Sequence, residues 1–153
     1  YTFTSFEQVK SSKSINELIK FHSNNKYLLL SYNQSQLKNL GKIVANHDKK
    51  FFEEIIEEYE HHLGLAFARL PRKGNYINTF SNIVGYFSDK LTIKEKEFIL
   101  DRFDKYKEDK LHLSVIVNLL KTYPIKYEID YLLDQTIWSV YPEELLDISD
   151  SGK

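Results

Sequence analysis

Residues 14–31 read SINELIKFHSNNKYLLLS, and this stretch decides the fold class. Ser14 is followed three residues later by Glu17, which is the capping-box pattern that begins an α-helix. Apolar residues then recur at the helical repeat, so we predict one helix from residue 14 to about residue 31. Its apolar stripe includes His22 and Lys26, and we expect both side chains on the buried side.

Similar signals mark further helices along the chain. Polar residues that cap helices precede the next apolar stripes: Asn33 or Ser35, Asp48, and Thr92 with Glu95. Pro71 and Pro124 are expected to end the helices that precede them. The strand-like stretches are short and fall inside helical periodicity. The sequence therefore predicts an all-α, compact single-domain bundle of about six or seven helices.

The length and composition indicate one folded domain. With 153 residues, of which 42% are hydrophobic, the chain can bury a core without disulfides or metals. We place the domain at residues 14–145, between an N-terminal extension (1–13) and a C-terminal tail (146–153). The chain begins with Tyr1 rather than Met, which is compatible with an upstream domain.

Charge and cysteine content exclude several classes of function. Lys and Arg total 21 against 22 Asp and Glu, so any contact with nucleic acid has to be local. With no cysteine, the chain has no disulfide, iron–sulfur cluster or catalytic thiolate. No apolar run approaches the roughly 20 residues of a membrane span. We expect a cytoplasmic protein with no membrane partner.

Several short motifs follow one another in a distinctive order. They are Phe21-His22, Lys26-Tyr27-Leu28-Leu29, Leu40-Gly41-Lys42-Ile43-Val44-Ala45, Asn78, Gly85-Tyr86-Phe87, Tyr106-Lys107, Leu119-Leu120, Tyr131-Leu132-Leu133, Gln135 and Tyr141-Pro142-Glu143-Glu144-Leu145. Across roughly residues 14–145 this pattern resembles the YbgA-like domain family, in which the helical domain occurs alone or behind a thiouracil-desulfidase-type domain. The resemblance implies an upstream or partner desulfidase-type domain and a nucleobase- or RNA-sulfur-related process. The family usually has a histidine at the position of Asn82.

The first candidate binding pocket combines His22, Lys26 and Tyr27. A buried ammonium needs an anion, a carboxylate or water, so Lys26 could hold a phosphate while His22 donates or accepts a proton. The alternative is that residues 23–25 rotate the helix and that Lys26 extends into solvent.

Asn78 and Asn82 form a polar strip on the fourth predicted helix, and we include them in the same pocket. Carboxamides offer donors and acceptors that suit a nucleobase edge or a phosphate. The alternative is that this strip faces solvent while the apolar residues of the helix pack inward.

A second set of candidates is basic. Arg69, Arg72 and Lys73 flank Pro71 and could contact phosphate, together with four lysines around the second helix: Lys38, Lys42, Lys49 and Lys50. Cations near a helix C-terminus are also favoured by its dipole without any ligand.

The sequence carries no motif of a standard enzyme or metal site. Glu58 and His61 have the Glu-x-x-His spacing of di-iron bundles, but the motif occurs once, so we expect no metal and no cofactor. Three hypotheses follow. The favoured one is a binding module for a nucleotide, an RNA element or a partner protein. The others are a small cysteine-independent enzyme on a nucleotide-like substrate using His22 and Lys26, and a structural or oligomerisation module.

Overall fold

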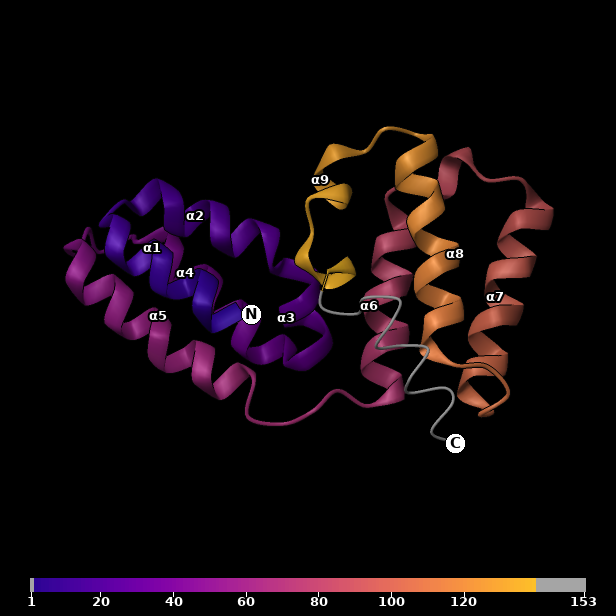
Figure 1. Ribbon diagram of the computed structural model, residues 1–153, viewed down its shortest axis with the longest axis horizontal. Helices are drawn as coiled ribbons and strands as arrows, with labels where there is room; N and C mark the ends of the chain where they lie inside the picture. The colour runs from indigo at the N-terminus through magenta and orange to yellow at the C-terminus, as the bar shows by residue number, and fades with distance from the viewer. Residues whose placement is uncertain (1, 140–153) are drawn as a thin grey trace. The chain divides into compact units, whose positions relative to one another are not determined.

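The computed structural model describes residues 2–139, and these residues form helices joined by short connections (Figure 1). The α-helices are α1 (Thr2–Ser12), α2 (Ile15–Asn24), α3 (Lys26–Tyr32), α4 (Gln34–Ala45), α5 (Phe52–Ala66), α6 (Lys73–Gly85), α7 (Ile93–Lys107), α8 (Leu113–Lys126) and α9 (Asp130–Leu133). Two 3-10 helices follow α6 and α9, namely η1 (Ser88–Lys90) and η2 (Thr136–Trp138). The predicted all-α class is confirmed. The tail at 146–153 and the motif that begins at Tyr141 lie outside the described residues.

The chain forms two compact units, one up to Pro71 and one from Arg72 onward. The sequence patterns do not predict this grouping, because periodicity shows which face of a helix is apolar but not which helix covers it.

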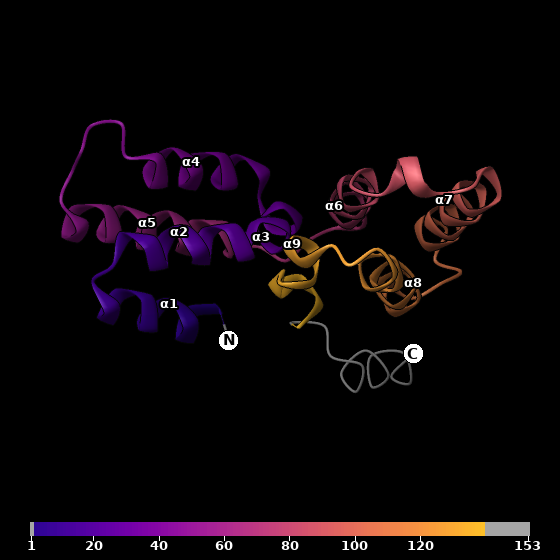
Figure 2. The same cartoon turned by 90° about the horizontal axis from the view of Figure 1, so that it is seen from above.

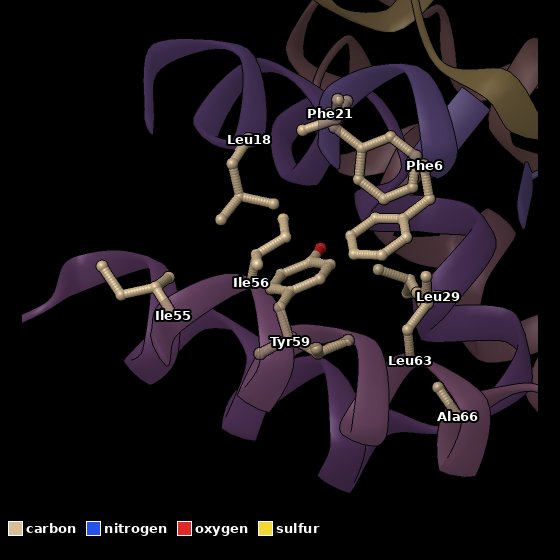
Figure 3. Packing of buried hydrophobic residues seen from close by; sticks show 11 residues of the cluster. Phe6, Leu18, Phe21, Leu29, Ile55, Ile56, Tyr59, Leu63 and Ala66 are labelled. Atoms are coloured by element: carbon tan, nitrogen blue, oxygen red, sulfur yellow. The ribbon is translucent and has the colours of Figure 1, made fainter. Parts of the chain in front are cut away.

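The core of the first unit is built from α1, α2, α3, α4 and α5. Figure 3 shows Tyr59 of α5 among Phe6, Leu18 and Phe21. The Phe6 ring stacks on the Tyr59 ring with centroids 5.8 Å apart and meets the Phe21 ring edge-on. Residues 2–12, which the sequence suggested only as an extension, therefore form a helix that contributes to this core.

The helix predicted over residues 14–31 is interrupted at Asn25. Ser14 caps α2 as predicted, accepting a hydrogen bond from the Glu17 backbone N–H at 3.4 Å. Asn25 is buried, and its Nδ2 donates to the Phe21 carbonyl at 2.8 Å. An asparagine side chain that bonds to the backbone in this way competes with regular helix geometry. The change of direction into α3 buries Tyr27 and leaves Lys26 exposed, so the predicted burial of Lys26 is wrong.

Other helix boundaries also differ in part from the prediction. Of the two predicted caps, Asn33 rather than Ser35 caps α4, and Phe51 rather than Asp48 precedes α5. α5 ends at Ala66, well before Pro71, and α8 continues through Pro124 to Lys126. A proline in a last turn removes one backbone hydrogen bond, which the packing of an apolar helix can offset.

The second unit contains α6, α7, α8 and α9. Figure 2 views α6, α7 and α8 nearly end-on, each beside the others. The residues that fill its core are Phe80, Ile83, Phe87, Ile99, Phe103, Ile116, Leu120, Leu132, Ile137 and Trp138. The capping box predicted at Thr92 and Glu95 is present in both halves, with hydrogen bonds of 2.9 and 3.1 Å.

Candidate functional site

His22 pairs with a tyrosine that lies 37 residues further along the chain. The last turn of α2 places the His22 ring beside α5, with Nδ1 2.9 Å from the Tyr59 hydroxyl oxygen. Tyr59 has no exposed surface, whereas His22 is half-buried. The Nδ1 edge of the histidine thus contacts the core, while another part of the ring is exposed.

Tyr59 determines which nitrogen of His22 carries the proton. Burial raises the pKa of Tyr59 well above its usual value, so the phenol stays protonated. A buried O–H needs an acceptor, and in the described part of the chain that acceptor is His22 Nδ1. We infer that Tyr59 donates to Nδ1 and that neutral His22 carries its proton on Nε2.

The Nε2 edge of His22 faces α4 at Gly41. A Cβ built at residue 41 would lie 3.6 Å from Nε2, so the histidine edge is within van der Waals reach of this point of α4. Because glycine has no side chain, no side-chain atom of residue 41 lies against Nε2. Gly41 belongs to one of the motifs that resemble the YbgA-like family.

The pKa of His22 is lowered, first by burial and then by the positive charge of Lys26. His22 is therefore mainly neutral at pH 7 and offers one N–H donor toward α4. The effect of the Lys26 charge on His22 also indicates that these two predicted pocket residues lie near each other.

Lys26 is an exposed cation. Its Nζ lies 5.6 Å from the centroid of its neighbour Tyr27, whose ring is buried. Within residues 2–139, no carboxylate lies within ion-pair distance of Lys26. The ammonium group is available to a ligand, although it does not lie in the buried position that the sequence predicted.

The stretch of sequence around His22 is rich in lysine and has no acidic residue. Residues 18–47 carry the four lysines Lys20, Lys26, Lys38 and Lys42 and have neither Asp nor Glu. Lys38 and Lys42 are exposed on α4, one turn before Gly41 and directly after it. We call His22, Lys26, Lys38 and Lys42 the basic cluster. The net charge of −1 does not reveal this local excess of positive charge. A search for long stretches without acidic residues would have found it.

The second set of predicted phosphate contacts is only partly available. The Lys73 ammonium forms an ion pair with Asp109, donates to the Tyr106 carbonyl at 3.2 Å and lies 5.3 Å from the Tyr106 ring centroid. Lys73 therefore ties the start of α6 to the end of α7. Arg69 belongs to the first unit and Arg72 to the second, and both are exposed. Their phosphate-contacting role stays a prediction.

Asn78 and Asn82 lie on an exposed face of α6. Asn82 Nδ2 donates to the Asn78 carbonyl at 2.8 Å, an interaction within one turn of the same helix. This placement agrees with the alternative in which the strip faces solvent. Both residues belong to the second unit, whereas His22 belongs to the first, and a pocket shared with His22 stays a prediction.

Two of the polar side chains of α5, His62 and Glu58, have structural partners. His62 Nδ1 lies 2.8 Å from Gln36 Oε1, and Glu58 accepts from the Lys50 ammonium at 2.5 Å. The described residues contain no group of three or more His, Asp or Glu side chains that could hold a metal ion. None of the described helices is long and apolar enough to cross a membrane.

Comparison with known proteins places this helical domain in a family. The family described as "Protein of unknown function (DUF1722)" matches residues 26–142, which is most of the chain, and the chain belongs to this family. It is also 21% identical over 136 residues to "Uncharacterized protein YbgA" of Escherichia coli (strain K12), covering 88% of this chain and 80% of that protein. These matches confirm the predicted YbgA-like relationship. No solved structure matches the chain.

Proposed function

We propose that this domain is a non-catalytic binding module that holds phosphate groups of RNA or of a nucleotide at the basic cluster. The observation that carries the proposal is that His22, whose Nδ1 contacts the Tyr59 hydroxyl, lies one helical turn before an exposed Lys26 that has no carboxylate partner among the described residues.

Phosphate oxygens are hydrogen-bond acceptors with negative charge. An imidazole N–H and an ammonium within one helical turn provide two donors of the required kind, and one of them is charged. Lys38 and Lys42 add positive charge on α4, where Lys42 also lines a pocket with Asp48 and Glu58. This arrangement suits a phosphate group better than it suits a cation or an apolar ligand.

Binding without catalysis is favoured by the role of the buried Tyr59 hydroxyl. The Tyr59 hydroxyl is used to orient His22, and its raised pKa makes it a poor acid at neutral pH. The enzyme alternative would require His22 to exchange a proton with substrate through Nε2. The sulfur-related context rests on the family resemblance alone.

The test measures binding of a fluorescently labelled single-stranded RNA of about ten nucleotides by anisotropy over a salt series. We expect Lys26→Ala and Lys42→Ala each to weaken binding roughly fivefold, the effect of about 1 kcal/mol. Each substitution should also reduce the steepness of log K against log salt by about 0.7, the value for one lost phosphate contact on a single strand.

Lys121→Ala is the matched control, because Lys121 is an exposed lysine of α8 in the second unit. Equal weakening by Lys121→Ala, or no RNA binding by the folded protein, would overturn the proposal for RNA. Competition by a mononucleotide would identify the nucleotide as the ligand, and a 2-thiouridine-containing strand tests the sulfur-related context. Conversion of the nucleotide during the assay would favour the enzyme alternative.

A further inference from the structure

The outward face of α7 combines apolar and charged residues at helical spacing. Ile93 is 76% exposed and Leu100 is 61% exposed, although both are large aliphatic side chains. Lys96, Asp104 and Lys107 are also exposed and continue the same face at intervals of three or four residues. An exposed apolar stripe of this kind, bordered by charge, is typical of an interaction surface.

A groove runs beside this face within the second unit. It has a volume of about 310 Å³, and its apolar lining includes Val84 of α6 together with Ile99, Leu100 and Phe103 of α7. Lys96 lies at its edge. The groove gives an incoming aliphatic side chain a concave apolar surface, which a single exposed leucine would not provide.

We propose that α7 packs antiparallel against α7 of a second copy of this chain, around a twofold axis at Leu100. In this register the two Leu100 side chains meet at the axis and enter the grooves beside them. One turn away, Lys96 faces Asp104 of the second copy, and twofold symmetry repeats this pair. Two turns away, Ile93 lies over the aliphatic part of Lys107 of the second copy.

The charge pattern of α7 selects the antiparallel direction. In a parallel pair, Lys96 would face Lys96 and Asp104 would face Asp104, and like charges repel. Asp104 now forms an exposed ion pair with Lys107, with a separation of 3.9 Å. Exposed pairs of this type contribute little, so exchanging it for the contact with Lys96 of a second copy costs little.

An interface made by one helix from each copy is small, so the dimer should form reversibly and depend on protein concentration. Sedimentation velocity over a concentration series measures its dissociation constant. We expect Leu100→Glu to raise that constant at least about tenfold, because it places two carboxylates at the apolar axis. Ile125→Glu is the matched control, since Ile125 is 57% exposed and belongs to α8 rather than to α7, and it should leave the constant unchanged.

The charge pair allows a test by rescue. Lys96→Asp alone and Asp104→Lys alone should each weaken the dimer, and the double variant should restore it, because opposite charges again face each other. Circular dichroism confirms that each variant is folded. A chain that is monomeric throughout the series, a dimer that Leu100→Glu leaves intact, or a double variant without rescue would overturn the proposal.

Discussion

Tyr59 places a polar hydroxyl group inside the otherwise apolar core of the first unit. Its ring packs with Phe6 and Phe21, while its hydroxyl reaches His22 Nδ1 at 2.9 Å. One residue therefore joins the hydrophobic core to the partly exposed basic cluster. A buried hydroxyl without a hydrogen-bond partner would cost free energy, so the Tyr59 hydroxyl and the His22 ring are held in contact.

Tyr59→Phe is expected to destabilise the protein by about 1 kcal/mol, the net value of one neutral hydrogen bond, and to leave His22 Nδ1 without its donor. Chemical denaturation measures the first effect. Nitrogen chemical shifts of the His22 ring measure the second, because they distinguish the two tautomers.

Tyr127→Phe is the control for this change. The Tyr127 hydroxyl donates to the Lys90 carbonyl at an exposed site, with a separation of 3.3 Å. We expect little loss of stability there. A loss for Tyr127→Phe as large as for Tyr59→Phe would contradict the structural role assigned to the buried pair.

The pH dependence of stability follows from the lowered pKa of His22. Burial and the charge of Lys26 disfavour the protonated ring in the folded state, so the unfolded chain binds the proton more readily, near its usual pKa of about 6.5. The stability that comes from keeping His22 neutral is fully present above pH of about 6.5. It is lost as the pH falls from there toward the folded-state pKa of His22. The difference in unfolding free energy between wild type and His22→Gln, measured from pH 5 to pH 8, should show this slope.

Lys26→Gln provides a second measurement of the same effect. Removal of the lysine charge should move the His22 titration midpoint upward toward 6.5 in an NMR titration, without reaching it, because burial is the larger cause. A wild-type midpoint at or above 6.5 would contradict the arrangement described here.

At the scale of the helices, capping residues explain where several elements begin. Ser14, Asn33 and Thr92 each accept a hydrogen bond from a backbone N–H in the first turn of the helix that follows. These starts were predictable because a cap and its helix are neighbours in sequence. The interruption at Asn25 was predicted only as an alternative, a rotation at residues 23–25, because it depends on a buried side-chain hydrogen bond to Phe21 within the first unit.

Thr92→Ala should destabilise the protein by about 1 kcal/mol, since it removes one half of the capping box at the start of α7. Thermal or urea unfolding followed by circular dichroism measures the loss. Thr92→Ser keeps the hydroxyl and should restore most of the stability.

Thr122→Ala is the matched control at an exposed position inside α8. The Thr122 hydroxyl donates to the Leu119 carbonyl, with a separation of 2.6 Å, and caps no helix start. We expect no loss of stability, because alanine is the better helix former. If both alanine variants lose equal stability, the cap at Thr92 does not act as described.

At the scale of the whole molecule, charge is distributed unevenly along a nearly neutral chain. Residues 18–47 carry no acidic side chain, whereas α5 carries five glutamates: Glu53, Glu54, Glu57, Glu58 and Glu60. The first unit thus contains both a basic and an acidic region, and its net charge describes neither. The two regions are separate along the sequence, whereas in the structure Lys42 of α4 and Glu58 of α5 line the same pocket.

The grouping into two units predicts where a protease cuts first. Residues 67–72 lie between α5 and α6, and both Arg69 and Arg72 are exposed. Limited trypsin treatment should therefore cleave after these arginines before it cleaves inside helices, and mass spectrometry identifies the fragments. The loop that contains Lys49 is the internal control, because Asn46 closes it with two hydrogen bonds to Lys50 of 2.8 and 3.2 Å. First cleavage after Lys49 would contradict the prediction.

By itself the sequence determined the all-α class, the helix starts at Ser14 and Thr92, the choice of Asn33 or Ser35 as a third start, and membership of the family. These features depend on local periodicity, on caps next to their helices, and on short motifs. Only the tertiary structure decided that Lys26 is exposed, that Lys73 is engaged by Asp109, and that His22 pairs with Tyr59 across 37 residues. The physical reason is that these outcomes depend on which apolar faces pack together, and packing brings together residues whose separation in sequence carries no periodic signal.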